Sequence, residues 1–319
     1  MKIFTIGPGR WGSFIAYYLD SIGHELTLYG RDSSEKMREL IKTRRNGNIT
    51  LSEKTKLTTS LSDAVGCELI VISIASQALR SLLKELKEIN IADTPLVLCM
   101  KGIEIESGLR LTEIVKEVLG KDTRVAVWLG PGHVEEFTRG RPNCMVIDSE
   151  DDELKHKLVD EFTSALIRFY YGTDLIGNEI GAAAKNVIGI AAGILDGLSL
   201  TSLKGALMAR APREISRLVG AMSGDPVSAY GLCHLGDYEA TVFSKYSHNR
   251  AYGESLVNKS EFSSLAEGYY TVKALINLAA RYSVELPICE AVYNVIYKNS
   301  DIKSEIEKLF KRSVKYEFD

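Results

Sequence analysis

The chain has 319 residues, of which 45% are hydrophobic and 25% are charged, and its formal net charge is −3. This length exceeds the usual size of one hydrophobic core, so two domains are expected, and the composition is that of an ordinary globular protein. The small negative charge excludes a general attraction to nucleic acid or to an anionic membrane, and we expect neither as a partner.

The first predicted strand covers residues 2–6 and runs into GPGRWG, where Gly7, Gly9 and Gly12 have the spacing GxGxxG; a predicted helix follows over 11–19. In this context Gly7 permits a tight turn, Gly9 lets the backbone approach a pyrophosphate, and Gly12 lets the helix pack closely on the strand. The helix N-terminus adds unpaired N–H donors and the positive end of its dipole. The motif therefore predicts a dinucleotide site, with a purely structural glycine turn as the alternative.

Short apolar stretches over 25–29, 68–74, 94–100, 124–130 and 143–148 predict strands that alternate with helices. Such alternation is typical of an α/β fold with a doubly wound parallel sheet, here Rossmann-like. After residue 174 helical patterns replace the strands, over 175–195, 202–222, 261–282 and 288–298, and an amphipathic helix at 301–312 is expected to dock on them. We expect a dinucleotide-binding domain over 1–175 and an all-helical substrate and catalytic domain over 176–319.

The residue that follows the second strand bears on the choice of cofactor. A carboxylate there usually binds the ribose 2′-hydroxyl of NAD, whereas an arginine accommodates the 2′-phosphate of NADP. Here the strand ends in LYGRDSS, which places Arg31 at that position and Asp32 after it. We therefore expect NADP or NAD, with NADP favoured; a solvated surface arginine is the alternative for Arg31.

The long predicted helix that begins near residue 175 carries glycines at every fourth position, with one exception. Gly177, Gly181, Gly189, Gly193 and Gly197 share a face, and the remaining place in the series is Lys185. Each interior glycine weakens a helix by about 1 kcal/mol relative to alanine, so some close approach must compensate. Either the face meets another domain or a ligand with the amine in the gap, or helices pack on it and Lys185 reaches out to water.

The five cysteines, Cys67, Cys99, Cys144, Cys233 and Cys289, are odd in number and lack metal-ligand spacing. They predict reduced thiols and no metal site. A strand predicted from the second residue leaves no room for a signal peptide, and the longest apolar stretch, 182–200, contains Lys185, Asn186 and Asp196. We therefore expect a cytoplasmic protein.

Over nearly its whole length the sequence resembles the NAD(P)-dependent glycerol-3-phosphate dehydrogenases. The motifs that carry the resemblance are, in chain order, GPGRWG (7–12), ASQALR (75–80), KGIE (101–104), LGPGHVEE (129–136), EIGAAAKNVIGIAAGILDGL (179–198), MARAPREI (208–215), GLCHLGD (231–237), SHNR (247–250), AEGYYTVKA (266–274) and ELPICEAVYNVIY (285–297). The resemblance implies reversible hydride transfer between NAD(P)H and dihydroxyacetone phosphate, giving sn-glycerol 3-phosphate for phospholipid synthesis, in a homodimer.

The resemblance also implies roles for particular residues. Lys185 is the catalytic lysine, Lys101 lies beside cofactor and substrate, and Asp237 orients the lysine or a substrate hydroxyl. A cation and acid at the carbonyl oxygen suits this reaction, because arriving hydride builds negative charge there. The implied cofactor contacts are Gly7, Gly9, Arg10, Trp11, Gly12, Arg31, Lys101, Val134, His248 and Glu267. The implied substrate contacts are Lys101, Gly130, Gly132, Lys185, Asn186, Asp237, Thr241, Ser247, His248 and Asn249.

The sequence departs from the family pattern mainly in the substrate half. His248 stands where the family has the first arginine of SRNR, and histidine cannot form the bidentate fork with phosphate. LSLTSLKG replaces a glycine-rich GxGxN run, Ala75 replaces a proline, Gly132 replaces a small hydroxyl residue, and Cys233 and His234 replace small residues. Arg250 or Lys204 could supply the lost charge. A dehydrogenase of another phosphorylated polyol or hydroxy compound, or a catalytically idle dinucleotide-binding regulator, are the alternatives.

Overall fold

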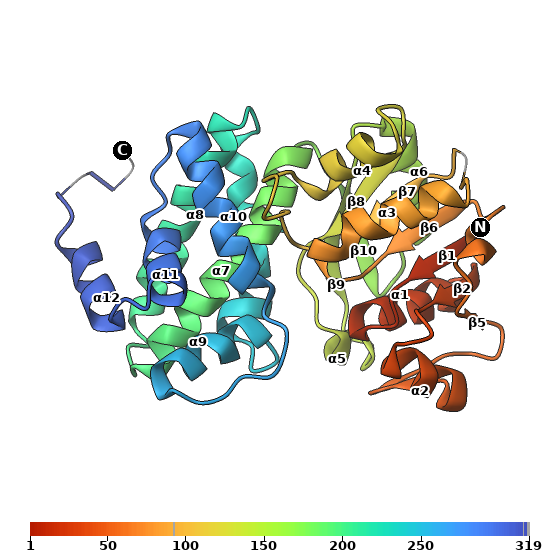
Figure 1. Cartoon of the computed structure of the whole chain (residues 1–319), viewed down its shortest axis with the longest axis horizontal. Helices are drawn as coiled ribbons and strands as arrows, with labels where there is room; N and C mark the ends of the chain where they lie inside the picture. The colour runs from red at the N-terminus through yellow and green to blue at the C-terminus, as the bar shows by residue number, and fades with distance from the viewer. Residues whose placement is uncertain (92, 315, 318–319) are drawn as a thin grey trace.

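The computed structural model describes residues 1–91, 93–314 and 316–317, and its first part is an eight-stranded sheet (Figure 1). The strand order is β10-β9-β8-β7-β6-β1-β2-β5, and β3 (Arg45–Asn46) and β4 (Ile49–Thr50) form a separate two-stranded pair. The strands of the large sheet are β1 (Lys2–Ile6), β2 (Glu25–Tyr29), β5 (Lys56–Thr58), β6 (Leu69–Ile72), β7 (Leu96–Leu98), β8 (Val125–Leu129), β9 (Asn143–Asp148) and β10 (Ile167–Tyr171).

The predicted sheet is confirmed with one correction, because β8 and β9 pair antiparallel. The other pairs of the large sheet are parallel. A parallel pair needs a crossover connection, usually a full helix. The segment 130–142 holds only the one-turn helix α5 (Val134–Phe137), so the chain returns in the opposite direction.

The order of the strands creates a topological switch point. The chain moves from β1 outwards to β2 and β5, and then returns to β6 on the other side of β1. In open α/β sheets, ligands bind at the carboxyl ends of the strands where the order reverses in this way. The GPGRWG loop follows β1 and Ser73 follows β6, so both lie at that point.

Helices cover both faces of the sheet. The helices α1 (Arg10–Ser21), α5 and α6 (Asp152–Phe162) bury apolar side chains such as Phe14 and Leu158 on one face. The helices α3 (Leu79–Glu88) and α4 (Leu111–Leu119) bury Leu83 and Ile114 on the other. Helix α2 (Glu35–Thr43) and the single turns η1 (Leu61–Ala64) and η2 (Ser76–Ala78) complete this part.

The second part is helical and is built around α7 (Leu175–Gly197), which runs through its centre (Figure 1). Around α7 lie α8 (Leu203–Ala221), α9 (His248–Asn258), α10 (Glu267–Tyr282) and α11 (Pro287–Tyr297), while α12 (Ile302–Phe310) packs on α11. The turns η3 (Pro226–Tyr230) and η4 (Leu235–Asp237) and the π-helical turn η5 (Glu239–Phe243) join α8 to α9.

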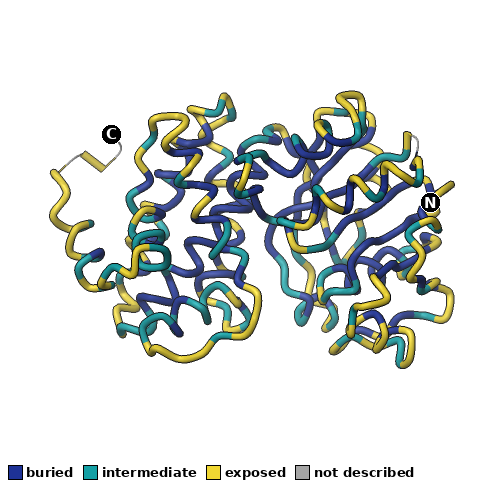
Figure 2. Tube along the Cα trace, viewed as in Figure 1, coloured by how far each residue is buried: buried dark blue, intermediate teal, exposed yellow. Residues whose placement is uncertain are grey.

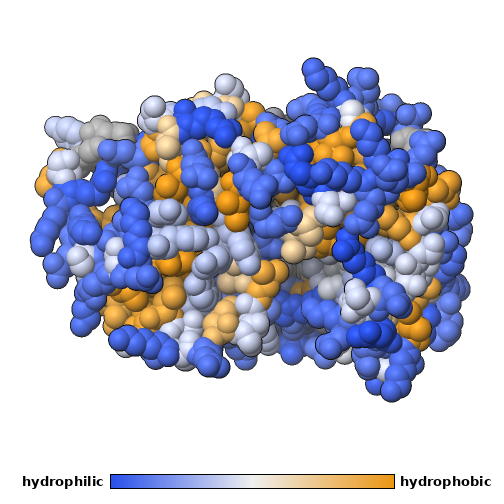
Figure 3. Space-filling view, in the orientation of Figure 1, coloured by the Kyte–Doolittle hydropathy of each residue, from blue (hydrophilic) through white to orange (hydrophobic). Residues whose placement is uncertain are grey.

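The length and apolar composition of α7 would suit a membrane span, and among the described helices it alone has both. Its residues are, however, mostly buried inside the protein, as the dark blue trace in Figure 2 shows. Figure 3 shows apolar surface over the region of α9, α11 and α12, and further apolar patches among hydrophilic atoms over the sheet part. Because most residues of α7 are buried, we conclude that α7 is the core helix of the second part.

The sequence-based boundaries need some correction. The helix predicted over 261–282 begins only at Glu267, and α9, β5 and β10 were not predicted. All five cysteines are free thiols, as expected.

Candidate active site

The turn between β1 and α1 has the shape that a pyrophosphate requires. Gly7 has φ = +118°, and a Cβ there would lie 2.0 Å from the backbone oxygen of Ser73. A Cβ on Gly12 would lie 2.0 Å from the oxygen of Gly7, so only glycine lets α1 pack this closely. A Cβ on Gly9, by contrast, would meet no atom within 4 Å. The open space at Gly9 therefore fits the backbone approach of a dinucleotide phosphate.

Helix α1 points its N-terminus at this cradle. Gly9 is its N-cap and accepts the N–H of Ser13, and the N–H groups of the first turn have no partner within the helix. Arg10 pairs with Glu135 of α5 at 2.8 Å. Trp11 packs against Phe14 with ring centroids 5.3 Å apart. The residues fit a bound dinucleotide at the switch point.

Arg31 lies just beyond β2, but it is engaged with a carboxylate. Its Nη2 lies 2.5 Å from Oε1 of Glu85 on α3, and both side chains are partly exposed. An anion that reaches Arg31 must therefore compete with Glu85. Sequence reasoning gave no sign of this pairing, since the two residues are 54 positions apart.

Lys185, Lys101 and Asp237 meet at the junction of the two parts. Oδ2 of Asp237 accepts a hydrogen bond from Lys101 Nζ at 2.5 Å and lies 3.1 Å from Lys185 Nζ. Lys185 also donates to Thr241 Oγ1 at 2.7 Å, and Lys101 donates to the backbone oxygen of Gly130 at 2.7 Å. One fully buried carboxylate thus holds two ammonium groups, one from each part of the chain.

The environment of Lys185 makes its amine a weaker base than usual. The pKa of Lys185 is lowered from 10.5 to about 8, mainly by burial; the charge of Asp237 opposes this shift and the charge of Lys101 contributes to it. Lys185 is only 8% exposed, so it does not reach out to bulk water. An amine with this pKa can give or accept a proton near neutral pH.

A chain of amides fixes the groups around the lysines. Asn186 Nδ2 donates to the backbone oxygen of Lys101 at 3.1 Å, and Asn249 Nδ2 donates to Asn186 Oδ1 at 3.0 Å. The backbone N–H of Gly268 donates to Asn249 Oδ1 at 2.9 Å. The loop after β7 and the helices α7, α9 and α10 are therefore linked through two asparagine side chains.

A cavity of about 320 Å³ opens in front of these groups. It is lined by predicted site residues from both parts of the chain: Arg10, Trp11, Lys101, Gly132, Lys185, Asn186, Thr241, Ser247, His248, Asn249 and Glu267. Other predicted residues lie outside its lining: Gly7, Gly9, Gly12, Arg31, Gly130, Val134 and Asp237. Val134 is only 6% exposed and belongs to the core beneath α5.

His133 also lines this cavity and was not predicted as a site residue. Its Nε2 is shielded from solvent and has no hydrogen-bond partner among the described residues. Burial lowers the pKa of His133, and the charge of Lys185 lowers it further, while Asp237 and Glu135 oppose the shift. Its ring lies edge-on to Tyr246 with centroids 5.8 Å apart. Its place inside the LGPGHVEE motif is the one available signal, and the residues predicted from that motif are Gly130, Gly132 and Val134.

His248 begins α9 beside Ser247, the N-cap residue, whose hydroxyl accepts the N–H of Arg250 at 3.2 Å. The His248 side chain is exposed, and its Nδ1 donates to the backbone oxygen of Leu265 at 3.3 Å. The two cations that could replace the missing family arginine are engaged elsewhere. Lys204 and Arg250 both pair with Asp196, at 2.6 and 2.5 Å, and neither lines the cavity.

The glycine stripe on α7 is a packing surface. A Cβ on Gly193 would lie 1.9 Å from the backbone oxygen of Arg250 on α9, and one on Gly189 would lie 2.7 Å from Thr241. The interpretation of close helix packing is therefore confirmed for the glycines. The expectation that Lys185 would then reach water is wrong, because Asp237 and Thr241 bind it inside the protein.

Further polar contacts join the two parts of the chain. Glu267, at the start of α10, accepts a hydrogen bond from Ser76 Oγ at 2.8 Å. On α7, Glu179 pairs with Arg110 at 2.5 Å and accepts the N–H of Thr112 at 3.0 Å. Glu267, which lines the cavity, and Glu179, which does not, thus both fasten the helical part to the sheet part.

Comparison with known proteins identifies relatives along the full chain. Residues 2–155 match the family model of the NAD-dependent glycerol-3-phosphate dehydrogenase N-terminus, and residues 174–307 match that of its C-terminus. The chain is 38% identical to a glycerol-3-phosphate dehydrogenase (NAD(P)+) of Fusobacterium nucleatum, with 99% of this chain and 98% of the relative covered. It is 35% identical to the enzyme of that name from Chlorobium phaeobacteroides, with 99% of each covered.

Solved structures with the same fold include the glycerol-3-phosphate dehydrogenase of Coxiella burnetii. The TM-score is 0.90 at 26% identity, over 97% of this chain and 98% of that one. A D-mandelate dehydrogenase in complex with NADH has a TM-score of 0.66 at 15% identity, over 94% of this chain and 98% of the other, which is a likeness of fold alone.

Proposed function

This chain belongs to the NAD-dependent glycerol-3-phosphate dehydrogenase family, and from that premise we propose how its residues divide the work of the reaction. It is an NAD(P)-dependent oxidoreductase that interconverts dihydroxyacetone phosphate and glycerol 3-phosphate. The observation that carries the assignment of roles is the shared hold of Asp237 on Lys101 and Lys185 at the cavity between the two parts.

In reduction, we assign the proton transfer to Lys185. When bound, the nicotinamide supplies or receives the hydride at carbon. Lys185 stabilises the charge that develops on the carbonyl oxygen and gives it a proton, and in oxidation the neutral amine takes the proton back. Asp237 is a positioning residue, because its oxygen orients Nζ of Lys185 from behind the cavity. Lys101 donates to the same oxygen of Asp237, and we assign it a contact with the substrate.

The cofactor contacts remain those expected of the turn after β1. The N–H groups at the start of α1 would hold the pyrophosphate, with Gly9 leaving it room, and Arg10, Trp11, Lys101, His248 and Glu267, which line the cavity, would contact the rest. We propose that NADP is preferred over NAD, because Arg31 follows β2, and that Glu85 moderates the preference by holding its guanidinium.

The substrate phosphate is assigned to the start of α9. Ser247, His248 and Asn249 line the cavity there together with Thr241 and Asn186, and His133 faces the cavity with a free ring nitrogen. With Lys204 and Arg250 committed to Asp196, the cationic side chains among the described residues that line the cavity are Arg10, Lys101 and Lys185, and His133 and His248 add ring nitrogens that can hydrogen-bond a phosphate. We further propose a cytoplasmic homodimer that supplies glycerol 3-phosphate for phospholipid synthesis.

The absence of the family arginine at position 248 favours a second candidate function, the dehydrogenation of an unphosphorylated hydroxy compound. The test is oxidation of NADPH and NADH with a panel of ketoses, each with and without phosphate. We expect turnover with dihydroxyacetone phosphate and little with dihydroxyacetone. Turnover of the plain ketoses alone would favour the second candidate, and a protein that binds cofactor without any turnover would contradict both.

His248→Arg tests the phosphate assignment directly. Restoring the guanidinium fork should lower KM for dihydroxyacetone phosphate and leave kcat nearly unchanged. His133→Gln should raise KM for the same substrate, since a hydrogen-bonding ring is lost. An unchanged KM in both variants would contradict the assignment, while activity itself would still stand.

A further inference from the structure

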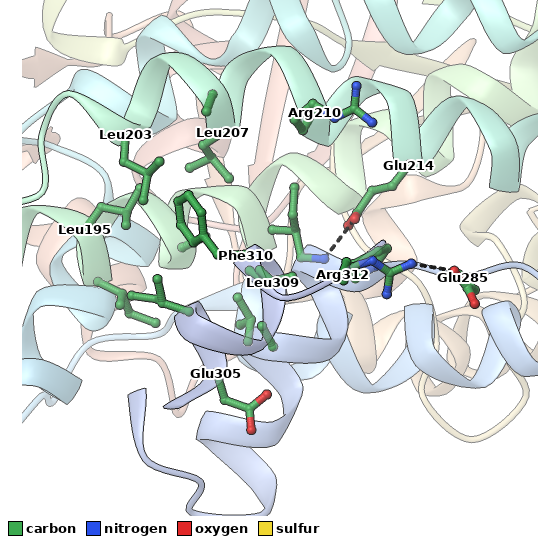
Figure 4. Close-up of a pocket in the computed structure, with 18 of the residues that line it drawn as sticks. Leu195, Leu203, Leu207, Arg210, Glu214, Glu285, Glu305, Leu309, Phe310 and Arg312 are labelled. Carbon is green, nitrogen blue, oxygen red and sulfur yellow. Dashed lines mark hydrogen bonds and ion pairs between the residues drawn. The ribbon is translucent and has the colours of Figure 1, made fainter. Parts of the chain in front are cut away.

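A second and larger cavity, of about 620 Å³, lies in the helical part between α7, α8, α11 and α12 (Figure 4). Small-molecule sites typically have volumes of roughly 300–1,000 Å³ and mostly apolar walls with a few polar groups. The residues that line this cavity include none of those that line the cavity at Lys185. It is therefore separate from the candidate active site.

One face of α8 changes its chemical character along the length of this cavity. Leu203, Leu207, Arg210, Glu214 and Arg217 follow one another at intervals of three or four residues, which places them on one face of the helix. The first two are apolar and the last three are charged. Figure 4 shows the same division across the cavity: leucines and Phe310 gather at one end, and Arg210, Glu214, Glu285 and Arg312 at the other.

The charged end contains two guanidinium groups without a carboxylate partner in the described ranges. Arg210 Nη1 donates to the backbone oxygen of Glu317 at 2.8 Å. Arg217 donates to the backbone oxygens of Arg213 at 3.2 Å and Glu285 at 3.0 Å. Arg312, by contrast, is paired with the carboxylate of Glu285 at 2.6 Å. Arg210 and Arg217 thus hold positive charge that no described acidic side chain neutralises by direct contact.

The carboxyl group of Glu214, which lies between Arg210 and Arg217 in the sequence, binds the start of α11. Glu214 is 2% exposed and accepts the N–H groups of Ile288 at 2.9 Å and Cys289 at 3.1 Å, in the first turn of α11. Burial raises the pKa of Glu214 to about 7, while these N–H groups and the charge of Arg217 oppose the shift. Glu214 therefore fastens α8 to α11, and the positive end of the α11 dipole offsets its charge.

From this division we propose that the cavity binds a single-chain amphiphile whose head group is a phosphate monoester. The alkyl chain lies against Leu203 and Leu207, where it leaves water. The phosphate dianion accepts hydrogen bonds from Arg210 and Arg217, and it matches two guanidinium charges where a carboxylate would match one. The alternative occupant of such an apolar groove is a second copy of the chain.

Calorimetric titration of the whole 319-residue chain with decyl phosphate, below its micelle concentration and with NADPH present, tests the proposal. We expect one molecule bound per chain. The variant with both Arg210→Gln and Arg217→Gln should bind about ten-fold to a hundred-fold more weakly, as expected for losing charged hydrogen bonds. Arg38→Gln, which removes an exposed arginine of α2 far from the cavity lining, should bind as the unmodified chain does.

Ala206→Trp provides an independent test, because Ala206 is exposed on α8 and lines the cavity. The larger side chain should fill the apolar end and block decyl phosphate without disturbing the fold, which circular dichroism would verify. Lys185→Ala should bind decyl phosphate normally, so this result does not depend on catalysis. Equal binding of decyltrimethylammonium, or of decanoate, would overturn the assigned head group. The proposal would be overturned if the unmodified chain does not bind decyl phosphate and forms a dimer that Ala206→Trp dissociates. The cavity would then be occupied by a second copy of the chain.

Discussion

At the scale of single residues, the reaction depends on how one carboxylate holds two amines. Asp237 is fully buried and touches both Lys101 and Lys185, and its second oxygen, Oδ1, has no partner among the described residues. A buried carboxylate oxygen without a donor carries an energetic cost of about 1–3 kcal/mol or more. A substrate hydroxyl or a water that donates to Oδ1 would remove this cost.

Replacing Lys185 separates its two proposed contributions. Lys185→Ala should lower kcat by about 10²–10⁴-fold, because general acid–base transfer is lost. Lys185→Arg should recover part of the charge stabilisation but little of the proton transfer, since guanidinium does not titrate in this range. Stopped-flow turnover and NADPH fluorescence titration measure the two effects. Cofactor affinity should be unchanged in both variants, and turnover near normal in Lys185→Ala would exclude the lysine from the chemical step.

The pH dependence has a definite sign because burial lowers the pKa of Lys185 to about 8. Below that pH the amine is protonated and can act as an acid, so kcat/KM for reduction should fall as pH rises through 8. In oxidation the neutral amine accepts the proton, so kcat/KM should rise through the same pH. Lys101→Met removes a neighbouring positive charge and should move the break upwards, whereas Asp237→Asn should move it downwards. If the pH at which kcat/KM changes is the same in both variants and in the unmodified chain, the titrating group is not Lys185.

Cofactor choice is expected to depend on the pair of Arg31 and Glu85. Arg31→Ala should weaken NADPH about ten-fold to a hundred-fold and NADH much less, because the 2′-phosphate loses a charged hydrogen bond. Glu85→Gln should strengthen NADPH relative to NADH, since the guanidinium is then free. Fluorescence titrations with both cofactors give the ratios. Equal losses of NADPH and NADH in Arg31→Ala would mean that the arginine reads adenine or supports the fold.

At the scale of secondary-structure elements, α7 shows why its glycines are there. Gly193 allows the backbone of α9 to approach so closely that a Cβ would lie 1.9 Å from a carbonyl oxygen. Because Ser247 and Asn249 belong to the same α9 segment that borders the cavity, the packing of these helices sets the position of the proposed phosphate site.

Gly193→Ala should therefore destabilise the protein by about 1–3 kcal/mol or more, as for other overpacked positions, and should raise KM for the phosphorylated substrate. The matched control is Gly205→Ala in α8, where an added Cβ would meet no atom within 4 Å. That change should stabilise by about 0.4–1 kcal/mol through the unfolded chain. Urea unfolding measures both. If the two substitutions have the same effect, the close approach of α9 is not what requires Gly193.

The elements that sequence could predict are those with a clear hydrophobic pattern. The strands at 2–6 and 143–148 have the predicted bounds, and Lys185 on α7 was located by a spacing that left one place in the glycine series. Helix α9 was missed because its sequence, HNRAYGESLVN, is largely polar and contains glycine. The edge strands β5 and β10 were missed because a short or half-exposed strand lacks the apolar run of a central one. The pairs of Arg31 with Glu85 and of Arg250 with Asp196 join distant positions, and no local pattern encodes them.

At the scale of the whole molecule, a buried ion pair helps to join the sheet to the helices. Arg110 of the sheet part and Glu179 of α7 pair at 2.5 Å, with side chains 8% and 5% exposed. Glu179→Ala would leave the buried guanidinium of Arg110 with the more exposed carboxylate of Glu113, at 3.2 Å, as its remaining partner, and breaking a buried pair typically costs about 3–5 kcal/mol.

We expect this variant to unfold at markedly lower urea concentration than the unmodified chain. Glu150→Ala breaks the more exposed pair with Lys116 and should cost about 1 kcal/mol or less. Similar small losses in both would show that the junction has other sufficient contacts.

The bridge from Lys101 through Asp237 to Lys185 makes turnover a reporter of assembly. The sheet part contributes one amine and the helical part contributes the other amine and the carboxylate, so neither part contains a complete reaction centre. A chain cleaved between β10 and α7 would regain activity only as its fragments reassociate. The rate at which turnover returns after mixing would therefore time the docking of one part on the other.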